Sequence, residues 1–182
     1  MTVYQLRYGK TLQSLSITDS FQADWIEPPF IKGLEDPLPL LKQALDSPLQ
    51  TPRIEDLLAT AQTVAIAIND KTRPVPHHFI LPPLLNRLHK IPKHKICFWI
   101  ATGTHLPMSD TEFPVILPSW IIEQYPVVSH NIDNASNFIF LGSTQRGSPI
   151  WAKRSFYEAD IKIVIGNIDP HHFSGFSRGY KT

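Results

Sequence analysis

Three short apolar runs constrain the fold of this chain more than any other feature. They cover residues 63–69, 95–101 and 160–166. Continuous apolar runs of this length are typical of strands that are buried on both faces, as in a parallel sheet. Segments that fit helices are interspersed with these runs, at residues 36–46, 54–62, 77–89 and near 120–123. Strands that alternate with helices indicate an α/β fold, a layered sheet of mainly parallel buried strands with flanking helices.

Two antiparallel strand pairs are predicted outside this sheet. Residues 3–8 and 12–17 alternate apolar and polar side chains around Gly9-Lys10, which predicts an N-terminal β-hairpin. Residues 138–142 and 149–151 form a second candidate pair. The chain has 17 prolines but only 8 glycines, which favours stiff turns and helix starts over flexible linkers.

Composition and charge exclude several classes of protein. The 17 Lys and Arg residues nearly balance the 16 Asp and Glu residues, and a net charge of +1 excludes a mainly electrostatic nucleic-acid binder and a polybasic membrane anchor. A hydrophobic fraction of 42% argues against a fully disordered chain. No apolar run approaches the ~18 residues that a membrane span needs, and the N-terminus lacks the apolar segment of a signal peptide. We therefore expect a cytoplasmic protein with no nucleic-acid partner and no membrane partner.

Two further features are interpreted as structural. The single cysteine, Cys97, excludes an internal disulfide and a cysteine-based zinc site, and its apolar neighbours indicate a buried small side chain. The adjacent pair His77-His78 stands at the start of a predicted helix, and we interpret both residues as surface polar groups.

Each apolar run leads into a polar loop that carries residues suited to chemistry. Asp70 and Arg73 follow the first run, His105 follows the second, and His171 and Lys181 follow the third. In open α/β sheets, ligand sites lie outside the carboxyl ends of the strands. An arginine there can bind a phosphate or a carboxylate through two hydrogen bonds. The three loops together predict a ligand site at one edge of the sheet.

Taken singly, each loop also has an ordinary interpretation. The loop from Asp70 could be a turn with a surface salt bridge, and His105 could be a solvated loop residue. Adjacent histidines in an extended segment point to opposite faces, so His171 and His172 make a poor metal chelate by themselves. Lys181 could be a covalent nucleophile, a phosphate ligand or a solvent-exposed charge.

The combination of four motifs resembles a known family. The motifs occur in the order Asp70-Lys-Thr-Arg-Pro74, Ala101-Thr-Gly-Thr-His105, Gly142-x-Thr-x-Arg146-Gly-x-Pro149 and Asp169-Pro-His171-x-Phe-x-Gly175-Phe176-Ser-x-Gly179-x-Lys181. Together they resemble the N-terminal domain of the nickel-pincer lactate racemase family. The resemblance covers nearly the whole chain.

The resemblance implies a reaction and a cofactor. The family interconverts the enantiomers or epimers of 2-hydroxy acids such as lactate, by proton-coupled hydride transfer. Its cofactor is a nickel-bearing pyridinium mononucleotide, held by two sulfurs and a carbon and attached to a lysine through a thioamide. Lys181 matches that lysine.

The resemblance also implies roles for individual residues. His105 and His171 match the two acid/base histidines of the family. Arg73 matches the arginine that orients the substrate or cofactor, and Asp70 and Thr72 lie beside it near the cofactor. No residue of this chain matches the family's nickel-ligating histidine, so no metal ligand is assigned.

The chain departs from the family pattern at three places. Leu106 stands where the family has an arginine, and Arg178-Gly179-Tyr180-Lys181 replaces a Gly-Gly-Arg-Lys or Gly-Gly-Ala-Lys ending. The sequence ends at Thr182, before the nickel-ligating histidine and the second domain of the family. We therefore expect residues 1–182 to be an incomplete N-terminal α/β domain, inactive alone. Its expected partners are a 2-hydroxy acid and the missing C-terminal domain or a second chain.

Two other functions stay open on the residues alone. A non-catalytic binding module or truncated relative could keep the fold and bind a nucleotide or an organic acid. A metal hydrolase could use Asp70, His105 and His171 to hold zinc with one open position.

Overall fold

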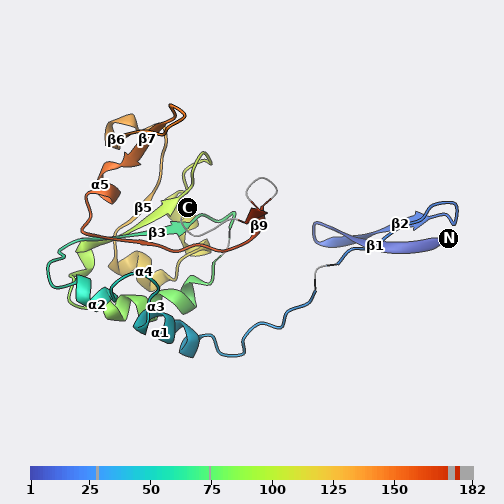
Figure 1. Cartoon of the computed structure of the whole chain (residues 1–182), viewed down its shortest axis with the longest axis horizontal. Helices are drawn as coiled ribbons and strands as arrows, with labels where there is room; N and C mark the ends of the chain where they lie inside the picture. The colour runs from blue at the N-terminus through green and yellow to red at the C-terminus, as the bar shows by residue number, and fades with distance from the viewer. Residues whose placement is uncertain (28, 74, 172–174, 177–182) are drawn as a thin grey trace. The chain divides into compact units, whose positions relative to one another are not determined.

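The chain divides into two units, Met1–Glu35 and Asp36–Thr182. The computed structural model describes residues 1–27, 29–73, 75–171 and 175–176 (Figure 1). The first unit contains the predicted hairpin, formed by β1 (Thr2–Tyr8) and β2 (Thr11–Ile17). The ring of Trp25 stacks on Tyr4 of β1, with 5.4 Å between the ring centroids.

A four-stranded parallel sheet lies at the centre of the second unit. Its strands are β3 (Val64–Asn69), β4 (Ile96–Ala101), β5 (Val127–Ser129) and β8 (Ile161–Val164). They lie in the order β5-β4-β3-β8, and every pair is parallel. This arrangement confirms the predicted α/β fold.

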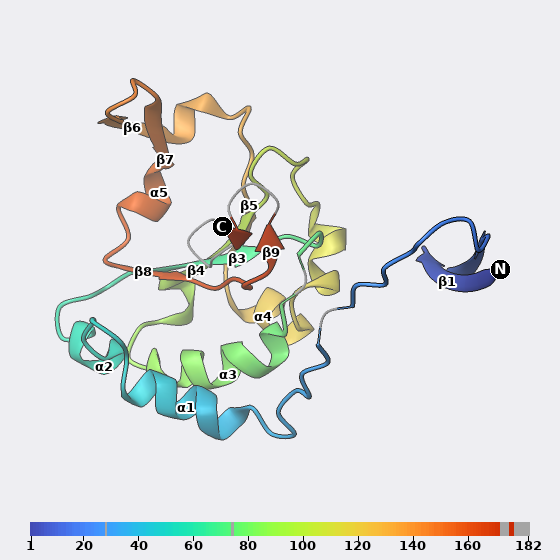
Figure 2. The same ribbon diagram turned by 45° about the vertical axis from the view of Figure 1, so that its right-hand side comes forward.

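Helices cover one face of the sheet, as Figure 2 shows. They are α1 (Leu38–Asp46), α2 (Ile54–Leu57), α3 (His77–Arg87) and α4 (Ser119–Gln124). Leu81 and Leu85 of α3 pack in the same buried cluster as Ile66 of β3 and Phe98 of β4. Burial of this apolar face is the main stabilising contribution to such a layered fold.

Smaller elements complete the second unit. They are β6 (Phe138–Ser143), β7 (Pro149–Lys153), α5 (Arg154–Tyr157), β9 (Pro170–His171), β10 (Gly175–Phe176) and the short 3-10 helices Lys93–Lys95, Asp110–Val115 and Ala135–Asn137. The β6–β7 pair confirms the second antiparallel prediction, and β9 pairs with β10, which the sequence analysis did not predict. In the part of the chain that the structure describes, no helix is both long and apolar enough to cross a membrane.

The three apolar runs differ in burial. Every residue of β3 is buried, as expected for the central strand of a layered sheet. In β8, however, Lys162 and Val164 are exposed, because they point to the face opposite the one on which Ile161 and Ile163 pack against the core. The prediction of burial on both faces is therefore wrong for β8.

His77 also differs from its interpretation as a surface residue. It is 2% exposed at the start of α3, whereas its neighbour His78 is exposed. The Nδ1 atom of His77 lies 2.9 Å from the carbonyl oxygen of Ile116, so Nδ1 carries the proton and donates it. Burial lowers the pKa of His77 below its ordinary value, although the hydrogen bond to Ile116 opposes this effect.

Acid is therefore expected to destabilise the fold through His77. Below the ordinary histidine pKa of 6.5, the unfolded chain binds a proton at His77 that the folded chain does not bind. The free energy of unfolding consequently falls as the pH falls below that value. Asparagine does not titrate and offers a donor in place of Nδ1, so H77N should lose less stability on acidification. Thermal unfolding at about pH 7.5 and about pH 5.5 measures this difference.

The matched control for this experiment is H78N, which removes an exposed histidine next in the chain. It should keep the acid sensitivity of the wild type. Equal loss of stability in H77N and the wild type would contradict the assignment.

Candidate active site

Polar loops follow the carboxyl ends of three neighbouring strands. Asp70 comes directly after β3, His105 lies on the loop after β4, and Asn167 lies on the segment after β8. Because these strands are parallel and adjacent, their carboxyl ends meet at one edge of the sheet. The described parts of these three loops therefore start from the same edge of the sheet.

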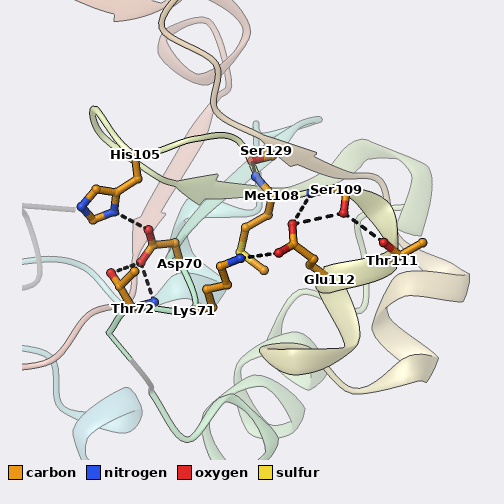
Figure 3. A network of polar contacts seen from close by, with 9 residues as sticks. All are labelled: Asp70, Lys71, Thr72, His105, Met108, Ser109, Thr111, Glu112 and Ser129. Atoms are coloured by element: carbon orange, nitrogen blue, oxygen red, sulfur yellow. Dashed lines mark hydrogen bonds and ion pairs between the residues drawn. The ribbon is translucent and has the colours of Figure 1, made fainter.

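A hydrogen bond joins Asp70 to His105 (Figure 3). The Nδ1 atom of His105 lies 2.7 Å from Oδ2 of Asp70. The Asp70 side chain is only 7% exposed, whereas that of His105 is 57% exposed. Figure 3 shows the other ring nitrogen, Nε2, pointing away from Asp70. Because the carboxylate accepts at Nδ1, a neutral His105 presents its lone pair at Nε2.

The loop after β3 holds Asp70 as a carboxylate. Its Oδ1 accepts hydrogen bonds from the backbone N–H of Thr72 at 3.0 Å and from the Thr72 hydroxyl at 2.6 Å. Burial opposes ionisation of Asp70, but the hydrogen bonds from Thr72 and His105 outweigh it and lower the pKa of this carboxyl. The ionised Asp70 can therefore orient His105 and stabilise its protonated ring.

The loop after β4 is held at both ends. The hydroxyl of Thr102 donates to the carbonyl oxygen of His130 at 2.9 Å, and the backbone N–H of Met108 donates to Oγ of Ser129 at 2.8 Å. Gly103 has a φ of +60°, a conformation that L side chains rarely adopt, in the tight turn before His105. These contacts hold the backbone of the loop that carries His105.

A cleft of about 580 Å³ opens beside this pair. The described residues that line it are Thr72, Arg73, His105, Asn167 and Asp169. It thus presents a guanidinium, a hydroxyl and an imidazole on one set of loops, and an amide and a carboxylate on another. Its volume lies within the range of about 300–1,000 Å³ that is usual for small-molecule sites.

The side of the cleft after β8 contains residues that the sequence analysis did not select. The side-chain amide of Asn69, at the end of β3, donates to Oδ1 of Asn167 at 3.0 Å. The amide of Asn167 in turn donates to Oδ2 of Asp169. The signal that could have found this network is Asn69 itself, a polar residue that ends an otherwise apolar run.

The described structure does not assign two of the selected residues to the cleft, for different reasons. His171 lies in β9, two residues after Asp169, and is not among the described residues that line the cleft. Lys181 lies outside the described residues. The roles of both residues stay predictions.

The arrangement does not support the metal-hydrolase hypothesis. Among the described residues, no three His, Cys, Asp or Glu side chains are grouped so that they could hold a metal ion. Asp70, His105 and His171 all belong to the described residues, and they do not form such a group.

Comparison with known proteins identifies the family. Residues 8–182 match the family model of the lactate racemase N-terminal domain. The chain belongs to this family. Two curated relatives are lactate racemases, from Thermoanaerobacterium thermosaccharolyticum and Lactiplantibacillus plantarum. They are 33% and 32% identical to this chain over 79% and 78% of its length.

A solved structure supports the same relationship. The lactate racemase apoprotein from Thermoanaerobacterium thermosaccharolyticum matches 99% of this chain with a TM-score of 0.81 and 29% identity. A protein from Thermotoga maritima matches 84% of the chain with a TM-score of 0.62 and 22% identity, and it shows the fold alone.

The chain is shorter than the lactate racemases that it matches. It spans 34% of the length of each curated relative and 42% of the solved lactate racemase chain.

Proposed function

We propose that this chain supplies the N-terminal part of the active site of a racemase or epimerase of 2-hydroxy acids, with lactate as the first substrate to test. The family membership supports the reaction class. The observation that carries the proposal is the Asp70–His105 pair at a cleft that also contains Arg73. An oriented base beside a cation suits a substrate that has both a hydroxyl and a carboxylate.

His105 is the proposed acid/base for one enantiomer of the substrate. Its Nε2 takes the proton of the substrate hydroxyl, and the ionised Asp70 stabilises the resulting imidazolium through Nδ1. The same nitrogen returns the proton in the reverse direction. The two enantiomers direct their hydroxyls differently, so the second one needs its own base, for which we propose His171.

Arg73 is the proposed anchor for a negatively charged group. Its backbone N–H donates to the carbonyl oxygen of Asp70 at 3.2 Å, which ties its position to that of the acid/base pair. A guanidinium can bind a carboxylate or phosphate through two parallel hydrogen bonds.

The residues of the cleft fit a mononucleotide. Arg73 offers a cation for a phosphate, Thr72 offers a hydroxyl, and the volume of the cleft suits a molecule of that size. We propose Lys181 as the covalent attachment point of a nickel-pincer nucleotide. Asp70, Thr72 and Arg73 are the residues that we propose to lie near this nucleotide. When bound, this cofactor supplies the acceptance and return of the substrate hydride. No nickel ligand is assigned to the described residues.

The proposal is tested by producing the chain, in a host that makes the cofactor, together with the polypeptide that corresponds to the rest of the relatives' length. We expect nickel-dependent interconversion of D- and L-lactate, measured by chiral chromatography. We also expect a nucleotide-sized adduct at Lys181, measured by peptide mass spectrometry. K181R should lose the adduct, and K90R, at an exposed lysine elsewhere, should keep it.

The contrary result is an unmodified Lys181 together with absence of turnover. If calorimetry then showed binding of a hydroxy acid or a mononucleotide, the non-catalytic binding module would be the better description.

A further inference from the structure

An ion pair lies next to the proposed acid/base pair and joins the same two loops (Figure 3). The ammonium of Lys71 contacts Oε1 of Glu112. Lys71 directly follows Asp70 in the chain, and Glu112 lies in the 3-10 helix Asp110–Val115, just beyond the loop that carries His105. The motif comparison assigned no role to either residue.

Glu112 uses its second carboxylate oxygen to hold the end of the His105 loop. Its Oε2 accepts the backbone N–H of Ser109 at 2.9 Å and the Ser109 hydroxyl at 3.1 Å. Next to Ser109, the buried Met108 is tied to Ser129 by its backbone N–H. One carboxylate therefore connects the end of the His105 loop to Lys71.

These contacts form a closed ring. It runs from Asp70 to His105 through their hydrogen bond, along the chain to Ser109, and through Glu112 and Lys71 back to Asp70. The loops after β3 and β4 are thus joined at two points. A connection at two points restrains both the separation and the relative rotation of the loops, whereas one hydrogen bond restrains only a distance.

We infer that Lys71 and Glu112 are positioning residues, whose ion pair holds the two loops so that Asp70 and His105 stay in hydrogen-bond contact. The geometry itself is independent of any reaction. Its consequence for turnover rests on the proposed function.

The exposure of the pair argues for a local role over a general stabilising role. The side chains of Lys71 and Glu112 are 47% and 35% exposed, and ion pairs this accessible to water contribute little to global stability. The hydrogen bonds from Lys71 and Ser109 lower the pKa of Glu112 to about 2, so Glu112 remains ionised at neutral pH. The pair of Arg53 and Asp56 has similar exposure but lies before β3, away from these loops, and serves as a matched control.

The inference is tested in the 182-residue chain itself by nuclear magnetic resonance of the histidine rings. In K71M and E112Q, we expect the exchange of the His105 Nδ1 proton with water to become at least about 5-fold faster. The thermal midpoint should move by no more than about 2–4 °C. K71R keeps the charge and should restore slow exchange. R53M should leave the exchange rate unchanged. D70A lacks the carboxylate that accepts from Nδ1, so it shows how fast the His105 Nδ1 proton exchanges without this hydrogen bond.

Two results would overturn the inference. One is an unchanged exchange rate in both K71M and E112Q while D70A is fast. The other is faster exchange that appears only with a matching fall in the thermal midpoint, which would make the pair merely stabilising.

Turnover is measured separately, so failure of this inference differs from failure of the proposed function. In the cofactor-loaded protein, K71M should lower kcat by about 10-fold with little change in KM, because a small misplacement of a reacting group slows the chemical step. A wild type that never racemises lactate would contradict the proposed function while leaving the exchange result intact. Normal kcat in K71M and E112Q would contradict the positioning role.

Discussion

Replacing His105 by alanine is expected to lower kcat of lactate racemisation by about 10²–10⁴-fold, the usual contribution of a positioned acid/base group. The imidazole is held by Asp70 and directs Nε2 away from it. Racemisation passes through the same two proton transfers in either direction. Loss of one base should therefore slow the conversion of both enantiomers. Initial rates from D-lactate and from L-lactate, at saturating substrate, measure the effect.

The control for this variant is H94A. His94 is an exposed histidine in the 3-10 helix Lys93–Lys95, at the opposite end of β4 from His105. Its removal should leave both rates at the wild-type level. Rates in H105A within a few-fold of wild type would refute an acid/base role for this residue.

Asp70 acts through His105, so the kcat of D70N is a second test of the Asp70–His105 pair. An amide cannot stabilise the imidazolium by charge, and its N–H group can face Nδ1 and favour the wrong tautomer. The decrease in kcat in D70N should be of similar order to the decrease in H105A. The double variant should be little worse than either single variant, because residues that act as a unit are strongly non-additive.

Replacing Phe98 by alanine is expected to destabilise the second unit by about 3–5 kcal/mol. Phe98 is fully buried in β4, in the cluster shared by the sheet and the covering helices. Its ring also meets Tyr125 edge-to-face, with 5.7 Å between the centroids. The truncation removes this contact and leaves a cavity, and the close-packed neighbours can fill that cavity only in part.

Thermal unfolding followed by circular dichroism should show a midpoint lower by about 6–20 °C for F98A. The comparison variant is F30A, because Phe30 is 92% exposed. That change should cost no more than about 0.5 kcal/mol. Equal midpoints for F98A and wild type would mean that Phe98 does not pack as the structure describes.

Much of the fold could be predicted because segments that are buried in the structure are also apolar in sequence. Residues 64–68 are apolar throughout, and β3 is buried throughout. The alternating segments 3–8 and 12–17 lie within β1 and β2, and each strand begins one residue earlier than predicted. The sequence does not show which face of a strand is covered, and β8 was therefore predicted to be buried on both faces although Lys162 and Val164 are exposed on one of them.

Some features could not be predicted, and the burial of His77 is one that depends on neighbours distant in sequence. His77 is buried by the segment that includes Ile116, so its own surroundings in the sequence gave no indication of burial. The helix predicted for residues 54–62 ends at Leu57 as α2. The β9–β10 pair is only two residues long on each strand, too short for a pattern of alternation.

For the site, sequence alone predicted which loops carry the candidate residues, and it determined which family the motifs resemble. Apolar periodicity identifies strands, and parallel strands place their following loops at one edge. Only the tertiary structure decided which side chains meet. The hydrogen bond between Asp70 and His105 spans 35 positions, the ion pair of Lys71 and Glu112 spans 41, and the contact of Asn69 with Asn167 spans 98. Such contacts depend on strand order and loop path, and these follow from packing of the whole core because no local run of residues encodes them.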